Sequence, residues 1–387
     1  MRVTEFEPGL TANSGHDIAR RAAIIFEEAC FEDGCIRDAL FRLRLTEAEL
    51  DRDFEEAFGL SADSYVQNRS SFFQEKTLSP ANGERITLYL RYRPPYRWDW
   101  IYRFLLDRAM PGVESALDGE YRRTVLFRRG ETDYTGWISV KDEPTNSRLK
   151  VTVSSSLLPV IPRVISRVRG LFDTDCDPAH IYEKLSVMND LKEGLCVPGA
   201  RAPGCFDSFE TAVRTVLGQQ ITVKAARTLA TRIVESFGDR IDSNEGGLER
   251  TFPQPDTFLE MSDSIGDRLG ALGVTGTRSR SIRAIAEGVT NGTIRLCRSA
   301  RFEEEEKKLL DLPGVGPWTA HCLGMRVFGL PDAFPHTDFG VKKALEGMTN
   351  REILALGESW RPWRSYAVIN LWNYDPSQVL SDEHLPK

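Results

Sequence analysis

The spacing of apolar residues changes twice along this chain, near residue 86 and again near residue 156. Between these points, "ITLYLRYRP", "YRRTVLFRRG", "DYTGWISVKD" and "RLKVTVSSS" alternate apolar and polar residues, as half-buried strands do. An amphipathic helix, "WDWIYRFLLDRAM", separates the first two segments. After residue 156 nearly every segment has helical spacing. The sequence therefore predicts an α+β fold that is mostly α, with one small antiparallel sheet.

A chain of 387 residues is long enough for two to four domains. We expect a helical segment over 1–85 and a small α+β domain over 86–155. Two helical subdomains follow: one combines 156–204 with 326–387, and the other spans 205–325. In the first segment, Thr46 and Glu49 match a capping box that starts a helix, and Gly59 is placed to end it. Residues 79–85 read as a polar linker.

Composition and charge narrow the class of protein. The chain is 41% hydrophobic and 28% charged, and no apolar run reaches the length of a membrane span. The start lacks the pattern of a secretory signal, and the seven cysteines are scattered without the paired spacing of a zinc site, so we expect a protein of the reducing cytoplasm. The net charge of −7 resides in 1–85, because the remainder holds 40 basic and 40 acidic residues. A neutral body of this kind still allows a local phosphate-binding face.

A glycine-rich turn lies in "LPGVGPWTAHCLGM", which begins at Leu312. Gly314 and Gly316 flank Val315 and allow backbone angles that other residues avoid. Their N–H groups can then point outward beside the start of the next helix, where an anion such as a DNA phosphate is favoured. A tight helix–helix connection also uses Gly and Pro, so the residues alone leave both interpretations open. No Gly-Lys-Ser/Thr follows, which excludes a P-loop.

A lone acid, Asp338, precedes the helical pattern "FGVKKAL". Asp at this position fits the preference for a helix N-cap. The functional alternative requires its carboxylate to face a cleft beside the bound phosphate. The spacing alone does not decide between them.

Several motifs together resemble one family. "LPGVGPWTA" followed by "HTDFGVKKAL" resembles the helix-hairpin-helix DNA glycosylase superfamily. "PGCFDSFETAVRTVLGQQITVKAA", "SWRPWRSYAVINLW" and "RPPYRWDWIYRFLLDRAMPGVES" are similar to the AlkA-type 3-methyladenine DNA glycosylases, over about 86–375. The resemblance implies an all-helical glycosylase core and base excision repair of double-stranded DNA that contains alkylated bases. It also implies a monomer with no membrane partner, associated with the nucleoid of a bacterial-type cell.

The resemblance assigns the catalytic role to Asp338. An alkylated purine such as 3-methyladenine is already cationic and leaves readily, so one carboxylate suffices to stabilise charge on the deoxyribose and to orient water. Relatives that also cut the strand carry a nucleophilic Lys two residues after the last hairpin Gly, where this chain has Trp318. We therefore expect a monofunctional enzyme without lyase activity. No cofactor is expected beyond a structural monovalent cation on the backbone carbonyls of Leu312 and Val315.

The resemblance also places residues around an extruded base, for which electron-rich rings suit a cationic lesion. Cys322 stands where relatives can place a Tyr, which leaves the preferred lesion open; His321 beside it reads as a packing residue. Core packing is the alternative for each aromatic residue. The predicted base pocket consists of Phe104, Trp318, Cys322, Phe339 and Trp372.

Predicted DNA contacts lie at three turns. The resemblance implies that Gln220 fills the gap left by the flipped nucleotide, although a buried amide that caps a turn is the alternative. A second Gly-bearing turn, "GVTGTRSRSIRA", adds arginines that either bind phosphate or solvate a helix start. The predicted DNA-binding residues are Gln219, Gln220, Arg278, Arg280, Gly314, Val315, Gly316 and Thr319.

The N-terminal segment resembles a helix-turn-helix of AraC-type regulators, as in Ada-type alkylation-response proteins. Its recognition helix would read "EAELDRDFEEAF", which is acidic and would repel phosphate. We expect a degenerate module with a structural or protein-contact role. Two alternatives to the alkylpurine glycosylase remain: a glycosylase for a deaminated or oxidised base, and an inactive damage-binding regulator.

Overall fold

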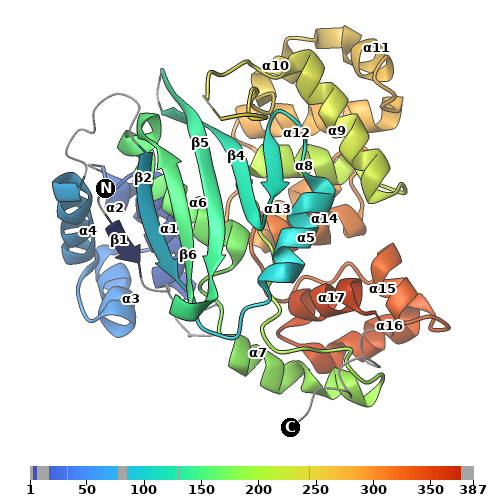
Figure 1. Ribbon diagram of the computed structural model, residues 1–387, viewed down its shortest axis with the longest axis horizontal. Coiled ribbons are helices and arrows are strands. Elements are labelled where there is room, and N and C mark those ends of the chain that lie inside the picture. The colour runs from blue at the N-terminus through green and yellow to red at the C-terminus, as the bar shows by residue number, and fades with distance from the viewer. Residues whose placement is uncertain are drawn as a thin grey trace.

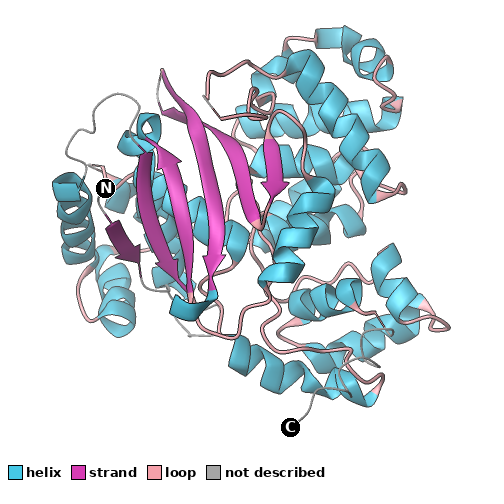
Figure 2. Cartoon of the chain, in the orientation of Figure 1, coloured by secondary structure: helices cyan, strands magenta, loops and turns pink. Residues whose placement is uncertain are grey.

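The structure is a computed structural model that describes residues 3–6, 17–32, 34–76, 85–129, 131–243 and 245–375. One twisted sheet lies beside the N-terminal helices, and the rest of the chain is helical (Figure 1, Figure 2). The predicted α+β, mostly α fold is confirmed. Most of the predicted linker, 79–84, lies outside the described residues.

The sheet has six strands in the order β1-β2-β6-β5-β4-β3. The four predicted strands are β2 (Arg85–Arg91), β4 (Glu120–Arg129), β5 (Thr132–Glu143) and β6 (Arg148–Ser154). Two more were not predicted, β1 (Val3–Phe6) and β3 (Glu114–Leu117). Because β1 pairs parallel with β2, the expected purely antiparallel sheet and purely helical 1–85 segment are both corrected. Strands of four residues are too short to show a clear alternation.

Two helices cover the sheet, α5 (Trp98–Arg108) and α6 (Ile161–Phe172). The buried residues of α6, including Val164, Val168 and Leu171, share a core with the sheet residues. We expected α6 to belong with the helical subdomain that begins at 156. Its strongly one-sided apolar face instead packs on the sheet, as a surface helix does.

The chain's last helices form a second layer with α7 (Pro178–Leu185). They are α15 (Phe339–Ala344), α16 (Asn350–Gly357) and α17 (Arg364–Asn373). Their core joins residues around Cys196 to Trp360 and Trp363, so two segments far apart in the chain pack together. Short 3-10 turns lie at Pro144–Asn146, Ser155–Val160, Ser186–Asp190, Ser262–Ser264 and Glu358–Trp360.

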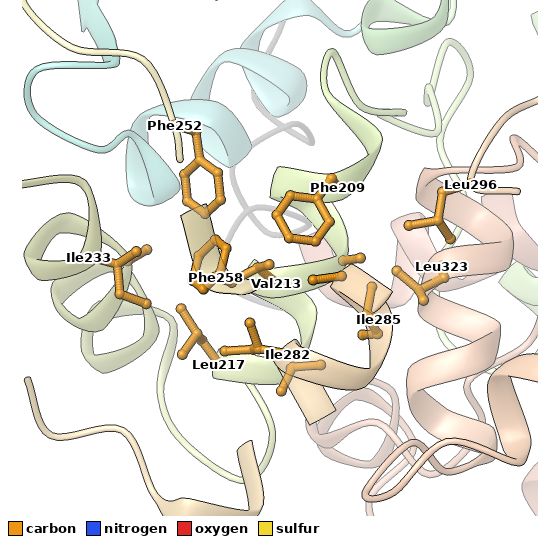
Figure 3. Close-up of a cluster of buried hydrophobic side chains, with 14 of the residues drawn as sticks. Phe209, Val213, Leu217, Ile233, Phe252, Phe258, Ile282, Ile285, Leu296 and Leu323 are labelled. Atoms are coloured by element: carbon orange, nitrogen blue, oxygen red, sulfur yellow. The ribbon is translucent and has the colours of Figure 1, made fainter. Parts of the chain in front are cut away.

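The third unit is the helical bundle of the middle of the chain. Side chains of α8 and α12 interdigitate at its centre, where Phe209, Val213 and Leu217 meet Ile282 and Ile285 (Figure 3). Its helices are α8 (Ser208–Leu217), α9 (Val223–Phe237), α10 (Pro255–Leu259), α11 (Ile265–Gly270), α12 (Gly276–Thr290), α13 (Phe302–Leu310) and α14 (Pro317–Arg326).

The N-terminal segment forms α1 (Asp17–Glu28), α2 (Cys35–Leu43), α3 (Glu47–Phe58) and α4 (Ala62–Lys76). The predicted capping box of Thr46 and Glu49 starts α3, and Gly59 ends it in a left-handed conformation. Figure 1 shows these helices on the far side of the sheet from α8, α12 and α14. The segment also reaches the first helix of the hairpin, because Arg44 lies 3.5 Å from the carboxylate of Glu304 in α13.

Ion pairs attach the N-terminal segment to α6. The carboxylate of Glu28 lies 2.9 Å from Nε of Arg163 and 2.6 Å from Nε of Arg167. Burial alone would raise the pKa of Glu28, but the two arginines lower it below its usual range. Arg21 adds a hydrogen bond of 2.8 Å to the carbonyl of Ser299.

We expect Glu28→Gln to lower the free energy of unfolding by about 1–2 kcal/mol, because two arginines lose their counter-charge. The loss is smaller than for a fully buried pair, since the Glu28 side chain is 23% exposed. Urea unfolding measures it, with Glu55→Gln on the exposed face of α3 as control. Equal stability of the two variants would contradict this role.

Candidate active site

The glycine-rich turn joins α13 to α14 and so forms the predicted hairpin, and it is contacted by the α8–α9 turn and by helix α12. From the α8–α9 turn, the Gln219 amide donates to the carbonyl of Gly314 at 2.9 Å and to Oγ1 of Thr319 at 3.0 Å. From α12, the Ser281 hydroxyl donates to the carbonyl of Pro313 at 2.6 Å. These bonds fix the turn before any ligand is bound.

The two hairpin glycines have different local roles. Gly314 has φ +73°, and a Cβ built on it would lie 2.4 Å from Oγ of Ser281. Its lack of a side chain is therefore required by the fold. Gly316 has φ −107°, and a Cβ there would meet open space. The fold itself does not require glycine at position 316. A ligand that approaches the backbone closely at this position would require it.

Asp338 lies between two indoles. Nε1 of Trp318 donates to its Oδ2 at 3.0 Å, and Nε1 of Trp372 donates to its Oδ1 at 2.8 Å. The backbone N–H of Gly340 donates to the same Oδ1 at 2.8 Å, so Asp338 is also the N-cap of α15. A carboxylate offers about four acceptor positions. These three bonds leave one position on Oδ2.

Aromatic rings continue from the acid. The ring of Phe104, from α5, lies nearly parallel to that of Trp372, with centroids 6.3 Å apart and an angle of 9°. Cys322 is buried, and burial together with the nearby Asp338 carboxylate raises the pKa of its thiol, which therefore stays neutral. Four of the five predicted pocket residues thus gather around Asp338.

The fifth, Phe339, is corrected by the structure. Its side chain is 80% exposed, so it belongs neither to the aromatic cluster nor to the core. It occupies the first position of α15, where its backbone follows the cap and its side chain turns outward. His321 is a packing residue as expected, because its Nδ1 accepts the backbone N–H of Phe334 at 3.2 Å.

The predicted DNA contacts divide into two groups. The Gln219 and Thr319 side chains are bonded to each other, and Arg278 donates to the carbonyl of Gln219, so these groups have partners within the protein. Gln220 and Arg280 are exposed, although Arg280 donates to Oγ1 of Thr277 at 3.3 Å. Gln220 has φ +55° in the α8–α9 turn, a left-handed conformation that is uncommon for residues other than glycine.

Two arginines beside Phe104 were not predicted. The guanidinium carbons of Arg108 and Arg326 lie 3.8 and 4.7 Å from the centre of its ring. For Arg108 a signal was present, because it follows Phe104 by four residues and so shares its helix face. Arg326 is far from Phe104 in the sequence, so no local pattern predicted their contact.

The hairpin carbonyls were also predicted to hold a cation. The backbone N–H of Val315 donates to the carbonyl of Leu312 at 3.2 Å, and this bond closes the turn between the two residues. Within the described ranges, no cluster of three or more His, Cys, Asp or Glu side chains is suited to a metal ion. No helix there combines the length and apolar character needed to cross a membrane.

Comparison with protein families gives two adjacent matches. Residues 87–207 match the AlkA N-terminal domain. Residues 213–351 match the model described as HhH-GPD superfamily base excision DNA repair protein. The second match contains the three turns and Asp338.

Two curated relatives show the extent of the similarity. The chain is 32% identical over 283 residues to DNA-3-methyladenine glycosylase 2 of Escherichia coli, which covers 73% of this chain and 95% of that protein. It is 34% identical over 297 residues to the probable bifunctional transcriptional activator/DNA repair enzyme AlkA of Mycobacterium tuberculosis. That match covers 76% of this chain and 58% of the longer mycobacterial protein.

Solved structures share the fold. A 3-methyladenine DNA-glycosylase from Archaeoglobus fulgidus aligns with a TM-score of 0.59 at 19% identity, covering 75% of this chain and 97% of that one. MBOgg1, solved in complex with a low-affinity DNA ligand, aligns with a TM-score of 0.58 at 22% identity, covering 76% and 96%.

Proposed function

This chain belongs to the HhH-GPD superfamily of base excision DNA repair proteins as a DNA-3-methyladenine glycosylase that repairs alkylated DNA, and we propose that it removes alkylated purines as a monofunctional enzyme with Asp338 as the catalytic carboxylate. The observation that supports this proposal is the Asp338 carboxylate, held by the two indole N–H groups of Trp318 and Trp372. Two ring donors fix both oxygens and leave room for one further partner.

The proposed reaction uses this arrangement directly. A base extruded from the duplex lies against Phe104 and Trp372, whose electron-rich faces favour a cationic alkylpurine. As the bond to the base breaks, positive charge develops on the deoxyribose, and the fixed carboxylate of Asp338 stabilises it. The open position on Oδ2 accepts a proton from the attacking water.

The lack of lyase activity follows from Trp318. It is the second residue after Gly316, and its ring nitrogen is an N–H donor to Asp338, so no amine stands there to form a Schiff base. We expect intact strands after base release and no protein–DNA adduct on borohydride treatment. A trapped adduct would contradict the monofunctional assignment.

DNA binding is assigned to the three turns. The start of α14 presents backbone N–H groups beside Gly316 to a phosphate, and Arg280 adds charge at the start of α12. Gln220 enters the gap left by the extruded nucleotide. The carbonyls of Leu312 and Val315, an all-oxygen donor set, suit a monovalent cation that would strengthen the grip on the phosphate. The enzyme acts as a monomer on duplex DNA.

The two hairpin glycines give a matched test of this interface. We expect Gly316→Ala to weaken binding to abasic-site duplex by about tenfold, the equivalent of one lost phosphate contact of 1–2 kcal/mol, with unchanged stability. Gly314→Ala should lower stability by about 1–2 kcal/mol through its left-handed backbone. Fluorescence anisotropy and thermal unfolding measure both. Wild-type affinity in folded Gly316→Ala would refute a phosphate contact there.

The function itself is tested with defined lesions. Duplexes that each carry one 3-methyladenine or 7-methylguanine should yield the free base and an abasic site. Tight binding without base release would instead identify an inactive damage-binding protein. Release of only deaminated or oxidised bases would assign a different lesion, for which the small Cys322 gives space.

A further inference from the structure

Two arginines flank the Phe104 ring without a carboxylate partner. Within the described residues, neither Arg108 nor Arg326 forms an ion pair. Arg326 donates to the carbonyls of Pro203 and Gly204, whereas Arg108 donates only to the carbonyl of Phe104, at 3.2 Å. A guanidinium has five N–H donors, so most of those on Arg108 remain available.

The charge of Arg108 is poorly compensated. Burial lowers its pKa most, and the neighbouring Arg326 and Arg214 lower it further. Arg214 itself is neutralised by two buried glutamates, at 2.8 and 2.7 Å. The carboxylate of Asp338 is one of the groups that raise the pKa of Arg108, so the two side chains interact electrostatically.

The position of Arg108 is fixed from its backbone. Nη2 of Arg214 donates to the carbonyl of Arg108 at 2.6 Å, which holds the end of α5. The guanidinium then lies over the ring of Phe104, which we proposed to contact the extruded base. Its planar fork of donors matches a base edge that carries two acceptors.

We infer that Arg108 is a specificity-determining residue, whose guanidinium bonds the acceptor edge of an extruded neutral base and disfavours a cationic one. The inference rests on the proposed pocket and deepens it. When a neutral purine leaves, the C1′–N9 bond breaks with its electron pair moving to the purine. Water adds to C1′, and the proton it loses neutralises the purine. A nearby cation stabilises the departing anion, whereas a cationic alkylpurine needs no such help and is repelled.

The test compares single-turnover release of 7-methylguanine and hypoxanthine from duplexes of one sequence. In Arg108→Met, we expect hypoxanthine release to fall by at least about tenfold, as for a lost hydrogen bond from a charged group. Release of 7-methylguanine should hold or rise. Arg108→Lys keeps the positive charge but loses the planar pair of donors, so it should reduce only hypoxanthine release. This variant tests the inference if Arg108→Met does not fold.

Arg103→Met is the matched control, because Arg103 is exposed on the same helix and its loss changes the net charge equally. It should leave the ratio of the two rates unchanged. An unchanged ratio in Arg108→Met, an equal fall of both rates, or a wild-type enzyme that releases 7-methylguanine but no hypoxanthine would each overturn the inference. A wild-type enzyme that releases no base at all would defeat the proposed function instead.

Discussion

Asp338→Asn should lower the single-turnover rate of 3-methyladenine release by about 10²- to 10³-fold, the usual effect of removing one preorganised electrostatic group. The amide retains the shape of the carboxylate, and Asn caps a helix as well as Asp does. Trp372 and Gly340 therefore keep their acceptor. What is lost is the negative charge beside the sugar, together with the acceptor for Trp318.

The comparison separates catalysis from binding and folding. Affinity for an abasic-site duplex and the melting temperature should stay close to those of the wild type. Asp311→Asn removes the same charge from an exposed position just before the hairpin, and should leave the rate unchanged. A rate in Asp338→Asn within threefold of wild type would eliminate the proposed mechanism.

The sequence predicted those features that depend on local pattern. The four longer strands, the capping box at Thr46 and the hairpin around Gly314 each follow from spacing within about ten residues. The family resemblance then assigned the catalytic role to Asp338. It did not reveal that Trp318 and Trp372 each occupy one carboxylate oxygen, because that contact joins three separate helices.

Other features depend on long-range packing. Strand β1 exists only because the edge of β2 accepts it, and its four residues carry little pattern of their own. The exposure of Phe339 depends on how α15 starts from its cap, whereas its place beside the proposed catalytic acid predicted a pocket residue. Arg326 meets Phe104 across more than two hundred residues, beyond the reach of any local pattern.

A buried charge cluster between the sheet and the hairpin bundle provides the largest expected effect on stability. Arg123 of β4 bonds Glu210 of α8 at 2.6 Å, and Arg214 bonds both Glu210 and Glu114 of β3. Glu210 is 2% exposed. We expect Glu210→Gln to lower the free energy of unfolding by about 3–5 kcal/mol, because a buried cation loses its partner. Urea unfolding measures it, with the exposed Glu235→Gln of α9 as control.

If Arg108 determines specificity as inferred, the cluster connects stability to specificity. Arg214 uses the same guanidinium to hold Glu210 and the carbonyl of Arg108, so a folded Glu210→Gln enzyme should also lose discrimination between neutral and cationic bases. Replacing the pair by apolar residues, as Arg123→Met with Glu210→Leu, should restore much of the stability, since an apolar pair carries no desolvation cost. A double variant as unstable as the single one would mean that packing around α8, and not charge, holds the two units together.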